Sequence, residues 1–190
     1  HVVDKATKLQ TIFDRIELVD TRFEVLRQQA EARKWRSIAE GEPASRAEQA
    51  FANFCGQLDV DREFLRRANV GGERMRDEDI ERVRQIAAQY RWTTPSGEEA
   101  SFLSGNEIEN LTIRAGTLTQ AEREIINYHI VATIKMLEQL PWPKHLKNVP
   151  EYAGGHHERM DGKGYPKGLT RDQMSWQARM MGIADIFEAL

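Results

Sequence analysis

Apolar residues recur at helical spacing over most of the chain, and this pattern predicts a protein built from helices. The first stripe advances by alternating steps of four and three: Ile12, Ile16, Val19, Phe23, Leu26 and Ala30. A break at Gly41-Glu42-Pro43 separates it from a second stripe: Ala47, Phe51, Phe54 and Leu58. Such heptad-like spacing is typical of long helices that pack along each other. We therefore predict an antiparallel helical pair at the start of the chain.

Helix starts are also visible further along the chain. Asp77 is expected to cap a shorter helix, whose inner residues are Ile80, Val83, Ile86, Ala87 and Tyr90. Ser104 with Glu107, and Thr119 with Glu122, have the spacing of a capping box, which predicts two more helices. The second of these is long, and we expect one face of it to be buried: Ile126, His129, Thr133, Met136 and Leu140.

The C-terminal part of the chain continues the helical pattern. Pro150 is tolerated in a first helical turn, so a helix is expected to start at Asn148 or Val149. A final helix is expected from about Ser175. No stretch alternates with period two for long enough to predict a strand, and 93–97 is expected to be a loop. The predicted fold class is all-α, a multi-helix bundle.

Composition narrows the classes of protein further. A formal net charge of −3 leaves no basic surplus for binding a nucleic-acid polymer. Cys55 is the single cysteine, so no disulfide can form within the chain, which fits a cytoplasmic location. No apolar run approaches the roughly 20 residues that a membrane span needs. The chain begins and ends at no evident natural boundary, and we interpret it as a piece of a larger protein.

Three histidines are the first candidates for chemistry. His129 lies on the face expected to be buried, where a lone histidine is more often a hydrogen-bonded core residue than a ligand. His156 and His157 are neighbours, about 100° apart around a helix axis. Two adjacent histidines could therefore bind two different metal ions, or one could bind a metal ion while the other orients a second ligand.

Asp185 adds a carboxylate within a helix that is apolar nearly all round and is expected to be buried. A buried carboxylate is costly unless it is paired or bound to metal. The structural alternative is a salt bridge to Arg179 or Arg159. Three imidazoles and a carboxylate suit iron, manganese or zinc. Two such ions can clamp a phosphodiester for hydrolysis, which is the chemistry that these residues indicate.

A glycine-rich loop at 161–168 follows the histidine pair. Its glycines allow tight turns, while Lys163, Lys167 and the preceding Arg159 supply positive charge for a phosphate. Tyr165 could stack on a base or donate a hydrogen bond to a phosphate. The alternative is a purely structural turn after a helix, although eleven consecutive residues of this kind are far more specific than a lone Gly-X-Gly.

From about Ile113 to Leu190 the chain resembles the HD-GYP family of HD-superfamily phosphohydrolases. The resemblance is carried by Gly116-Thr117-Leu118-Thr119 with Glu122, by 156–166, and by Ile183-Ala184-Asp185. It implies hydrolysis of cyclic di-GMP to pGpG or GMP with two or three divalent metal ions, most often iron or manganese. The implied metal ligands are His129, His156, His157 and Asp185. The resemblance further implies catalytic roles for His156, His157 and Asp185, and substrate contacts for Arg159, Lys163 and Tyr165.

The chain also departs from the family pattern. It contains no His-Asp dipeptide, which in the family is followed by a segment like 2–9. We therefore expect residues 1–9 to be the end of an upstream HD segment, 10–112 a helical insertion and 113–190 the C-terminal part of the domain. We expect the insertion either to form a homodimer or to receive an input signal. We expect little turnover by these 190 residues alone.

Two alternatives to a cyclic di-GMP phosphodiesterase stay open. One is a degenerate, non-catalytic signalling module whose loop binds a partner such as a diguanylate cyclase domain. The residues before His1 would discriminate, because a His-Asp pair followed by lysine favours an enzyme. The other is an HD-type hydrolase of a different cyclic dinucleotide, which base-specific contacts would have to distinguish.

Overall fold

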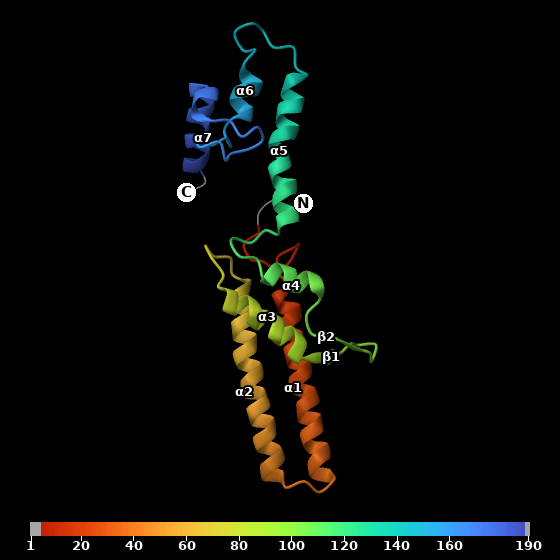
Figure 1. Cartoon of the computed structure of the whole chain (residues 1–190). Helices are drawn as coiled ribbons and strands as arrows, with labels where there is room; N and C mark the ends of the chain where they lie inside the picture. Colours follow the sequence, from red (N-terminus) through yellow and green to blue (C-terminus); the bar gives the residue numbers. More distant parts are fainter. Residues whose placement is uncertain (1–4, 189–190) are drawn as a thin grey trace. The chain divides into compact units, whose positions relative to one another are not determined.

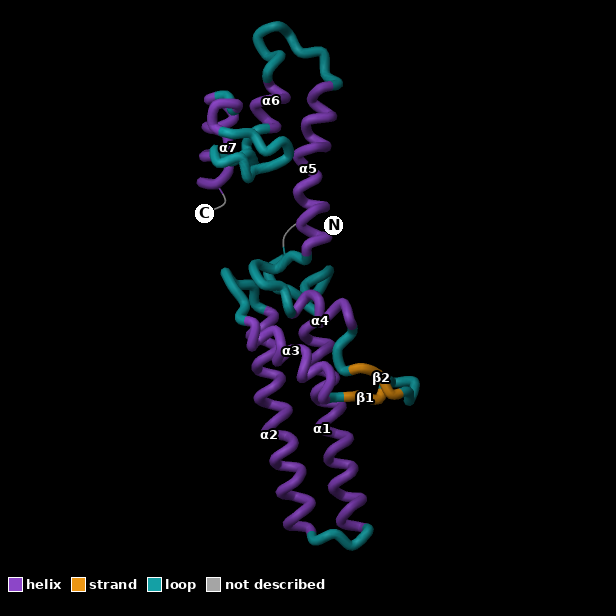
Figure 2. Tube along the Cα trace, viewed as in Figure 1, coloured by secondary structure: helices purple, strands orange, loops and turns teal. Residues whose placement is uncertain are grey.

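The structure is a computed structural model that describes residues 5–188. Contacts divide the chain into two compact units, residues 1–119 and residues 120–190, which we call the N-terminal and the C-terminal unit. Each is described by itself. Helices dominate both, so the predicted all-α class is confirmed (Figure 2). Among the described residues, no helix combines the length and the apolar character that crossing a bilayer requires.

A long antiparallel helical hairpin organises the N-terminal unit. Helices α1 (Ile16–Ala39) and α2 (Ala44–Asn69) lie side by side and are joined by a short turn (Figure 1). The predicted pair is confirmed, and so is most of its inner stripe: Val19, Phe23, Leu26, Ala30, Ala47 and Leu58 are buried. Cys55 is buried in the same hairpin, as a small core residue.

The start of the first helix was placed one turn too early. Ile12 was expected on the inner stripe, but it precedes α1 and is 98% exposed. The cause is Asp14, which accepts hydrogen bonds from the Ile16 backbone N–H at 3.0 Å and from the Thr7 hydroxyl at 2.6 Å. A side chain that satisfies the first free N–H groups of a helix fixes its N-terminus.

Two further helices pack against the hairpin. Helix α3 (Asp77–Gln89) begins at Asp77, which is its first residue rather than its cap, and buries Ile80, Val83 and Ile86. Helix α4 (Gly105–Leu111) starts with the predicted capping box, in which Ser104 and Glu107 satisfy each other's backbone N–H groups. Their side chains join one core around Phe102 and Leu65, both fully buried.

A two-stranded hairpin between α3 and α4 was not predicted. Strands β1 (Arg91–Thr93) and β2 (Glu99–Ser101) pair antiparallel, with Trp92 opposite Ala100. Three residues per strand are too few for an alternating pattern to be recognised in a sequence. The turn contains Gly97, whose φ of +87° favours glycine.

Asp61 and the core residue Tyr90 form a buried polar contact. The Tyr90 hydroxyl donates to Asp61 Oδ2 at 2.8 Å, and Gln57 and Arg82 also contact this carboxylate. Burial, together with this hydrogen bond, raises the pKa of Tyr90, so the phenol stays protonated. Replacing Tyr90 with Phe should lower the free energy of unfolding by about 1–2 kcal/mol, because one charge-assisted hydrogen bond is lost while packing is kept. Chemical denaturation would measure this, and an unchanged stability would contradict the role assigned to the hydroxyl.

The C-terminal unit consists of α5 (Gln120–Glu138), α6 (Val149–Gly154), a short 3-10 turn η1 (Arg171–Gln173) and α7 (Trp176–Glu188). Helix α6 lies between α5 and α7 and contacts both (Figure 1). The predicted starts near Thr119, Val149 and Ser175 are confirmed within one residue. Pro150 lies in the first turn of α6, as expected.

The buried faces predicted for α5 and α7 are wrong. On α5 Ile130 is fully buried, whereas His129 and Met136 are exposed, as is Leu140 just after the helix. Apolar residues occur on more than one face of this helix, so periodicity could not decide which face meets α6. On α7 Ala178 is buried, but Ile183, Ile186 and Phe187 are exposed. Its closest approaches to the preceding segment are made at the small residues Ala178 and Gly182.

Candidate metal centre

The three predicted histidines meet in the C-terminal unit. Ligand nitrogens of His129, His156 and His157 all lie within 4.8 Å of one another. His129 comes from the middle of α5, while the other two follow α6 directly, in a turn. His156 and His157 were predicted to lie on a helix, but they lie in the turn that follows the last residue of α6, Gly154. His129 was expected to be buried but is exposed, and its neighbours His156 and His157 are partly buried.

Backbone carbonyls determine how two of these rings face the cluster. His129 Nδ1 contacts the Ile126 carbonyl oxygen, and His156 Nδ1 lies 2.6 Å from the Ala153 carbonyl oxygen. A carbonyl only accepts, so each Nδ1 must be the donor in its contact, which in a neutral imidazole leaves the lone pair on Nε2. Metal-binding histidines are commonly oriented in this way. In both cases the carbonyl belongs to the residue three positions earlier, within α5 for His129 and at the end of α6 for His156.

His157 is the central ring of the cluster. Its Nε2 lies 3.2 Å from His129 Nε2, and its ring centroid is 4.1 Å from that of His156. Burial, followed by the neighbouring imidazoles, lowers the pKa of His157, and the carboxylate of Asp185 opposes this shift. A neutral imidazole with a free lone pair is the form that binds metal.

Asp185 approaches the cluster from α7. Its Oδ2 lies 4.0 Å from His157 Nδ1. Neither arginine considered as its partner in the sequence contacts it, since Arg159 pairs with Asp161 and Arg179 donates to the Met174 carbonyl oxygen. Half of the Asp185 side chain is exposed, so the expectation of a fully buried carboxylate is wrong. Within residues 5–188, the side chain recorded beside the Asp185 carboxylate is the imidazole of His157.

Two glycines allow α7 to come close enough. A Cβ on Gly182 would lie 2.8 Å from the carbonyl oxygen of His156, and one on Gly155 would lie 2.7 Å from Ala178 Cβ. Both distances are shorter than carbon contacts normally allow. Close packing of small residues between α6 and α7 therefore places Asp185 beside the histidines.

The loop 159–169 is held by a residue that the sequence analysis did not single out. The Glu158 carboxylate is buried and accepts backbone N–H groups of Lys167 at 2.6 Å and Leu169 at 2.7 Å. One side chain thus closes a loop of some ten residues. A signal was present, because Glu158 is an acidic residue within the motif, but nothing in the sequence showed which N–H groups it would reach.

Substitution of Glu158 with Gln tests this loop anchor. The amide would keep one accepting oxygen but would turn its NH₂ group towards the second N–H, so about 1.5–3 kcal/mol of stability should be lost. Thermal unfolding of the variant measures the loss. Glu151→Gln, at an exposed position on α6, is the matched control and should unfold like the parent. Equal behaviour of the two variants would contradict the anchoring role.

The three predicted substrate residues lie on this loop. Tyr165 stacks on His157 with ring centroids 4.8 Å apart and an interplanar angle of 16°, and burial raises the pKa of its hydroxyl. Arg159 is exposed and pairs with Asp161 at 3.0 Å. The backbone N–H of Lys163 donates to the same carboxylate, while its side chain is exposed. The structure thus places Tyr165 against the histidines and leaves the two cations on the outer side of the loop.

The donor set fits a divalent metal ion. Two imidazole nitrogens bound to one ion at about 2.0–2.1 Å lie roughly 3.0–3.4 Å apart, which matches the 3.2 Å between His129 and His157. Imidazole with carboxylate and no thiolate suits iron, manganese or zinc. A pocket of about 410 Å³ adjoins His156 and is also lined by Arg159 and Gly182. Of the four proposed ligands, only His156 lines this pocket.

Comparisons with known proteins point in the same direction. A 3'3'-cGAMP-specific phosphodiesterase of Vibrio cholerae is 38% identical over 77 residues, which are 40% of this chain and 16% of that protein. A second 3'3'-cGAMP-specific phosphodiesterase of V. cholerae is 52% identical over 42 residues, 22% of this chain and 10% of that protein. A cyclic di-GMP phosphodiesterase of Thermotoga maritima is 33% identical over 82 residues, 43% of this chain and 22% of that protein. The chain therefore spans less than a quarter of each of these relatives, and no solved structure matches it.

The family model described as HD domain matches residues 73–190, so it includes α3, α4 and the whole C-terminal unit. Helices α3 and α4 lie in the range that the sequence analysis assigned to an insertion, and the limits of that insertion stay a prediction. HD domains are metal-dependent, in agreement with the donor set described above. Since the match covers well over half of its residues, this chain belongs to the HD domain family, and its named phosphodiesterase relatives place it with the HD-GYP type that its motifs resemble.

Proposed function

We propose that this chain supplies part of the active site of a metal-dependent phosphodiesterase that hydrolyses a cyclic dinucleotide. The observation that carries the proposal is the convergence of His129, His156 and His157 within 4.8 Å, with Asp185 beside them. These are the four residues proposed to bind metal, and they come from three separate elements. A structural role alone would not require three rings to direct nitrogens towards one point.

The chain's own residues would position the reactants. His129 and His156, each held by a backbone carbonyl, present Nε2, while His157 and Asp185 complete the donor set. Bound divalent ions would supply a hydroxide nucleophile and neutralise charge on the phosphodiester. Orientation of these ligands before substrate arrives accounts for much of the catalytic effect of such a site.

The loop 159–169 would contact the substrate. Arg159 and Lys163 carry positive charge on exposed side chains, which suits a phosphate group. Tyr165, held by its stack on His157, presents its hydroxyl near the same region. Glu158 would act as a positioning residue, because it holds the loop but points inward.

Cyclic di-GMP is the proposed substrate, and 3'3'-cGAMP is the second candidate. Both are taken from the names of relatives, and two relatives at 38% and 52% identity are named for 3'3'-cGAMP. We also propose that the site binds two or three divalent ions, iron or manganese, and that the protein is cytoplasmic. The division of the chain into an upstream HD segment (1–9), a helical insertion (10–112) and the C-terminal part of the domain (113–190) is also proposed. We further propose that the long hairpin takes part in dimerisation. A non-catalytic module that binds a diguanylate cyclase domain is the alternative.

The deciding experiment compares Asp185→Asn with the parent in the full-length protein that contains these residues. With Mn²⁺ or Fe²⁺ supplied, the parent should hydrolyse cyclic di-GMP or 3'3'-cGAMP, and the variant should lose about 100-fold or more in kcat. Asp172→Asn, in the exposed turn η1, is the control and should keep full activity. A parent protein that binds either nucleotide but hydrolyses neither would support the non-catalytic alternative.

A further inference from the structure

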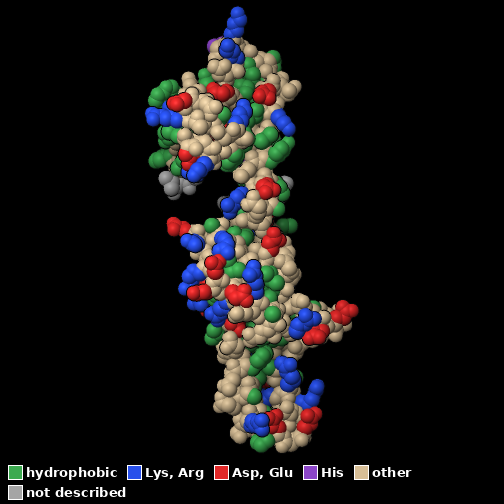
Figure 3. Space-filling model, viewed as in Figure 1, with side chains coloured by type: hydrophobic (Ala, Val, Ile, Leu, Met, Phe, Trp, Pro, Cys, Tyr) green, Lys and Arg blue, Asp and Glu red, His purple; other side chains and the backbone are tan. Residues whose placement is uncertain are grey.

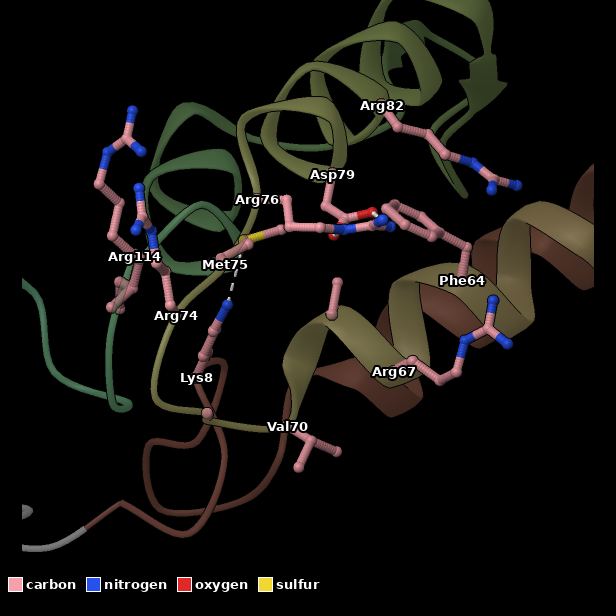
Figure 4. Close-up of a pocket in the computed structure, with 13 residues that line it drawn as sticks. Lys8, Phe64, Arg67, Val70, Arg74, Met75, Arg76, Asp79, Arg82 and Arg114 are labelled. Carbon is pink, nitrogen blue, oxygen red and sulfur yellow. Dashed lines mark hydrogen bonds and ion pairs between the residues drawn. The ribbon is translucent and has the colours of Figure 1, made fainter.

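A second site candidate lies in the N-terminal unit. A pocket of about 490 Å³ is formed where the segment around Lys8, the end of α2, the start of α3 and residues 113–114 meet (Figure 4). Six cationic side chains line it, against a single carboxylate from Asp79: Lys8, Arg67, Arg74, Arg76, Arg82 and Arg114. Figure 3 shows Lys and Arg side chains on this part of the surface, with acidic side chains among them. A chain with a net charge of −3 thus concentrates positive charge at one place.

Part of this charge is balanced within the protein. Arg76 pairs with Asp79 through two hydrogen bonds of 2.9 and 3.0 Å, and Arg114 pairs with Asp77 at 2.6 Å. Arg82 lies 3.3 Å from Asp61 and stacks 4.2 Å over the Phe64 ring. Arg67 and Arg74 have no ion pair with any of residues 5–188.

Lys8 is the least expected member of the set. It is 3% exposed, and its ammonium group donates to the Met75 sulfur at 3.3 Å and to the Leu111 carbonyl oxygen at 3.2 Å, both of them uncharged. Burial lowers its pKa, against the attraction of Asp79. A buried cation without a carboxylate in contact is costly, and an anion in the pocket would offset that cost.

The backbone holds two of the arginines close together. Met75 N–H donates to the Arg114 carbonyl oxygen at 2.7 Å, and Gly116 N–H donates to the Gly72 carbonyl oxygen at 2.9 Å. These bonds join two segments that are forty residues apart in sequence, and Figure 4 shows the side chains of Arg74 and Arg114 next to each other. Asp77, which does not line the pocket, already pairs with Arg114, so Arg74 is the cation at this end that has no ion pair with residues 5–188.

The cations lie at two ends of the pocket. In Figure 4, Arg74 and Arg114 lie at one end and Arg67 and Arg82 at the other. The paired Arg76 and Asp79 lie between these ends, and Lys8 reaches in beside Met75. The Phe64 ring is buried and already covered by Arg82, so it offers no free face for a base. Arginine is well suited to phosphate oxygens, which it can bind through two N–H groups at once. Recognition by this pocket would therefore be directed at phosphate groups rather than at a nucleobase.

From these observations we infer that this pocket binds a small molecule that carries two or more phosphate groups. One group would lie between Arg74 and Arg114, another near Arg67, and Lys8 would contact the anion from below. The pocket lies wholly within the N-terminal unit and shares no residue with the histidine cluster. The inference therefore does not depend on the proposed phosphodiesterase function.

Calorimetric titration of the metal-free protein with tripolyphosphate tests the inference. The parent should bind one tripolyphosphate, and Arg67→Gln with Arg74→Gln should weaken binding by at least about 10-fold, since two charge-assisted contacts are lost. Both side chains are exposed, so folding should be unaffected. The matched control is Arg46→Gln with Arg84→Gln, which removes the same charge from exposed positions outside the pocket.

Two more variants distinguish binding in this pocket from a structural role of Lys8 and from binding at the histidine cluster. Lys8→Met should also weaken binding by about 5-fold or more, whereas a purely structural lysine would change stability and leave affinity unaltered. His157→Ala should bind tripolyphosphate like the parent. Absence of binding by the parent, an equal loss in the control pair, or loss of binding in His157→Ala would each overturn the inference.

Discussion

Replacement of His157 by Ala is expected to reduce the affinity for Mn²⁺ or Fe²⁺ by more than about 100-fold and to abolish hydrolysis. Loss of a group that merely supports a metal ligand costs about 10–100-fold in affinity, so loss of a ligand should cost more. His157 is the ring that contacts the most partners, since it touches His129, His156, Tyr165 and Asp185. No other single substitution would disturb as many members of the cluster.

Metal content of the full-length protein, measured after purification and after titration with Mn²⁺, checks this result. The control is His145→Ala, because His145 is an exposed histidine of the same unit that lies outside the cluster. This control should keep both metal and activity. Retention of metal and turnover by the His157 variant would remove His157 from the proposed ligand set.

Substitution of Gly164 with Ala is expected to destabilise the C-terminal unit by about 3 kcal/mol or more, at the upper end for overpacking. A Cβ at this position would lie 2.5 Å from Glu158 Cα and would also overlap the Arg159 backbone nitrogen. Both neighbours are backbone atoms, so no side-chain rotation can relieve the clash. The loop would have to move, and with it the Glu158 anchor and the stack of Tyr165 on His157.

Unfolding followed by circular dichroism measures the stability change, and a metal titration reports the effect on the cluster. Gly56→Ala provides a control of opposite sign. Gly56 lies inside α2, and a Cβ at this position would meet no atom within 4 Å, so alanine should stabilise that helix by roughly 0.5–1 kcal/mol. Wild-type stability of the Gly164 variant would show that the loop does not pack against 158–159 as described.

Local patterns predicted the helices well where one apolar face dominated. The stripe Val19 to Ala30 and the capping box at Ser104 are local features, and each was found where expected. The buried face of α5 was mistaken because Ile126, Ile130 and Met136 lie around more than one side of the helix. The packing of α6 against α5 determines that the side with Ile130 is the buried one. The hairpin at 91–101 was missed because each strand is three residues long.

Candidate ligands could be proposed from residue type, but their geometry could not. Nothing in the spacing of His129, His156 and Asp185 shows that they meet, because the separations along the chain are 27 and 29 residues. Glu158 escaped attention because its partners are backbone N–H groups, which leave no mark in a sequence. The cationic pocket was likewise invisible, since its arginines are scattered from 67 to 114 among ordinary charged residues.

By itself, the sequence determined the all-α class, the long helical hairpin, and the motif from His156 to Pro166 with its family resemblance. Those features depend on short-range periodicity and on residues that are neighbours along the chain. The tertiary structure alone decided that three imidazole nitrogens converge, that Gly182 lets Asp185 approach them, and that Lys8 is buried at a pocket lined by arginines. Contacts of this kind arise from packing between distant segments, where backbone shape and side-chain volume determine which groups meet.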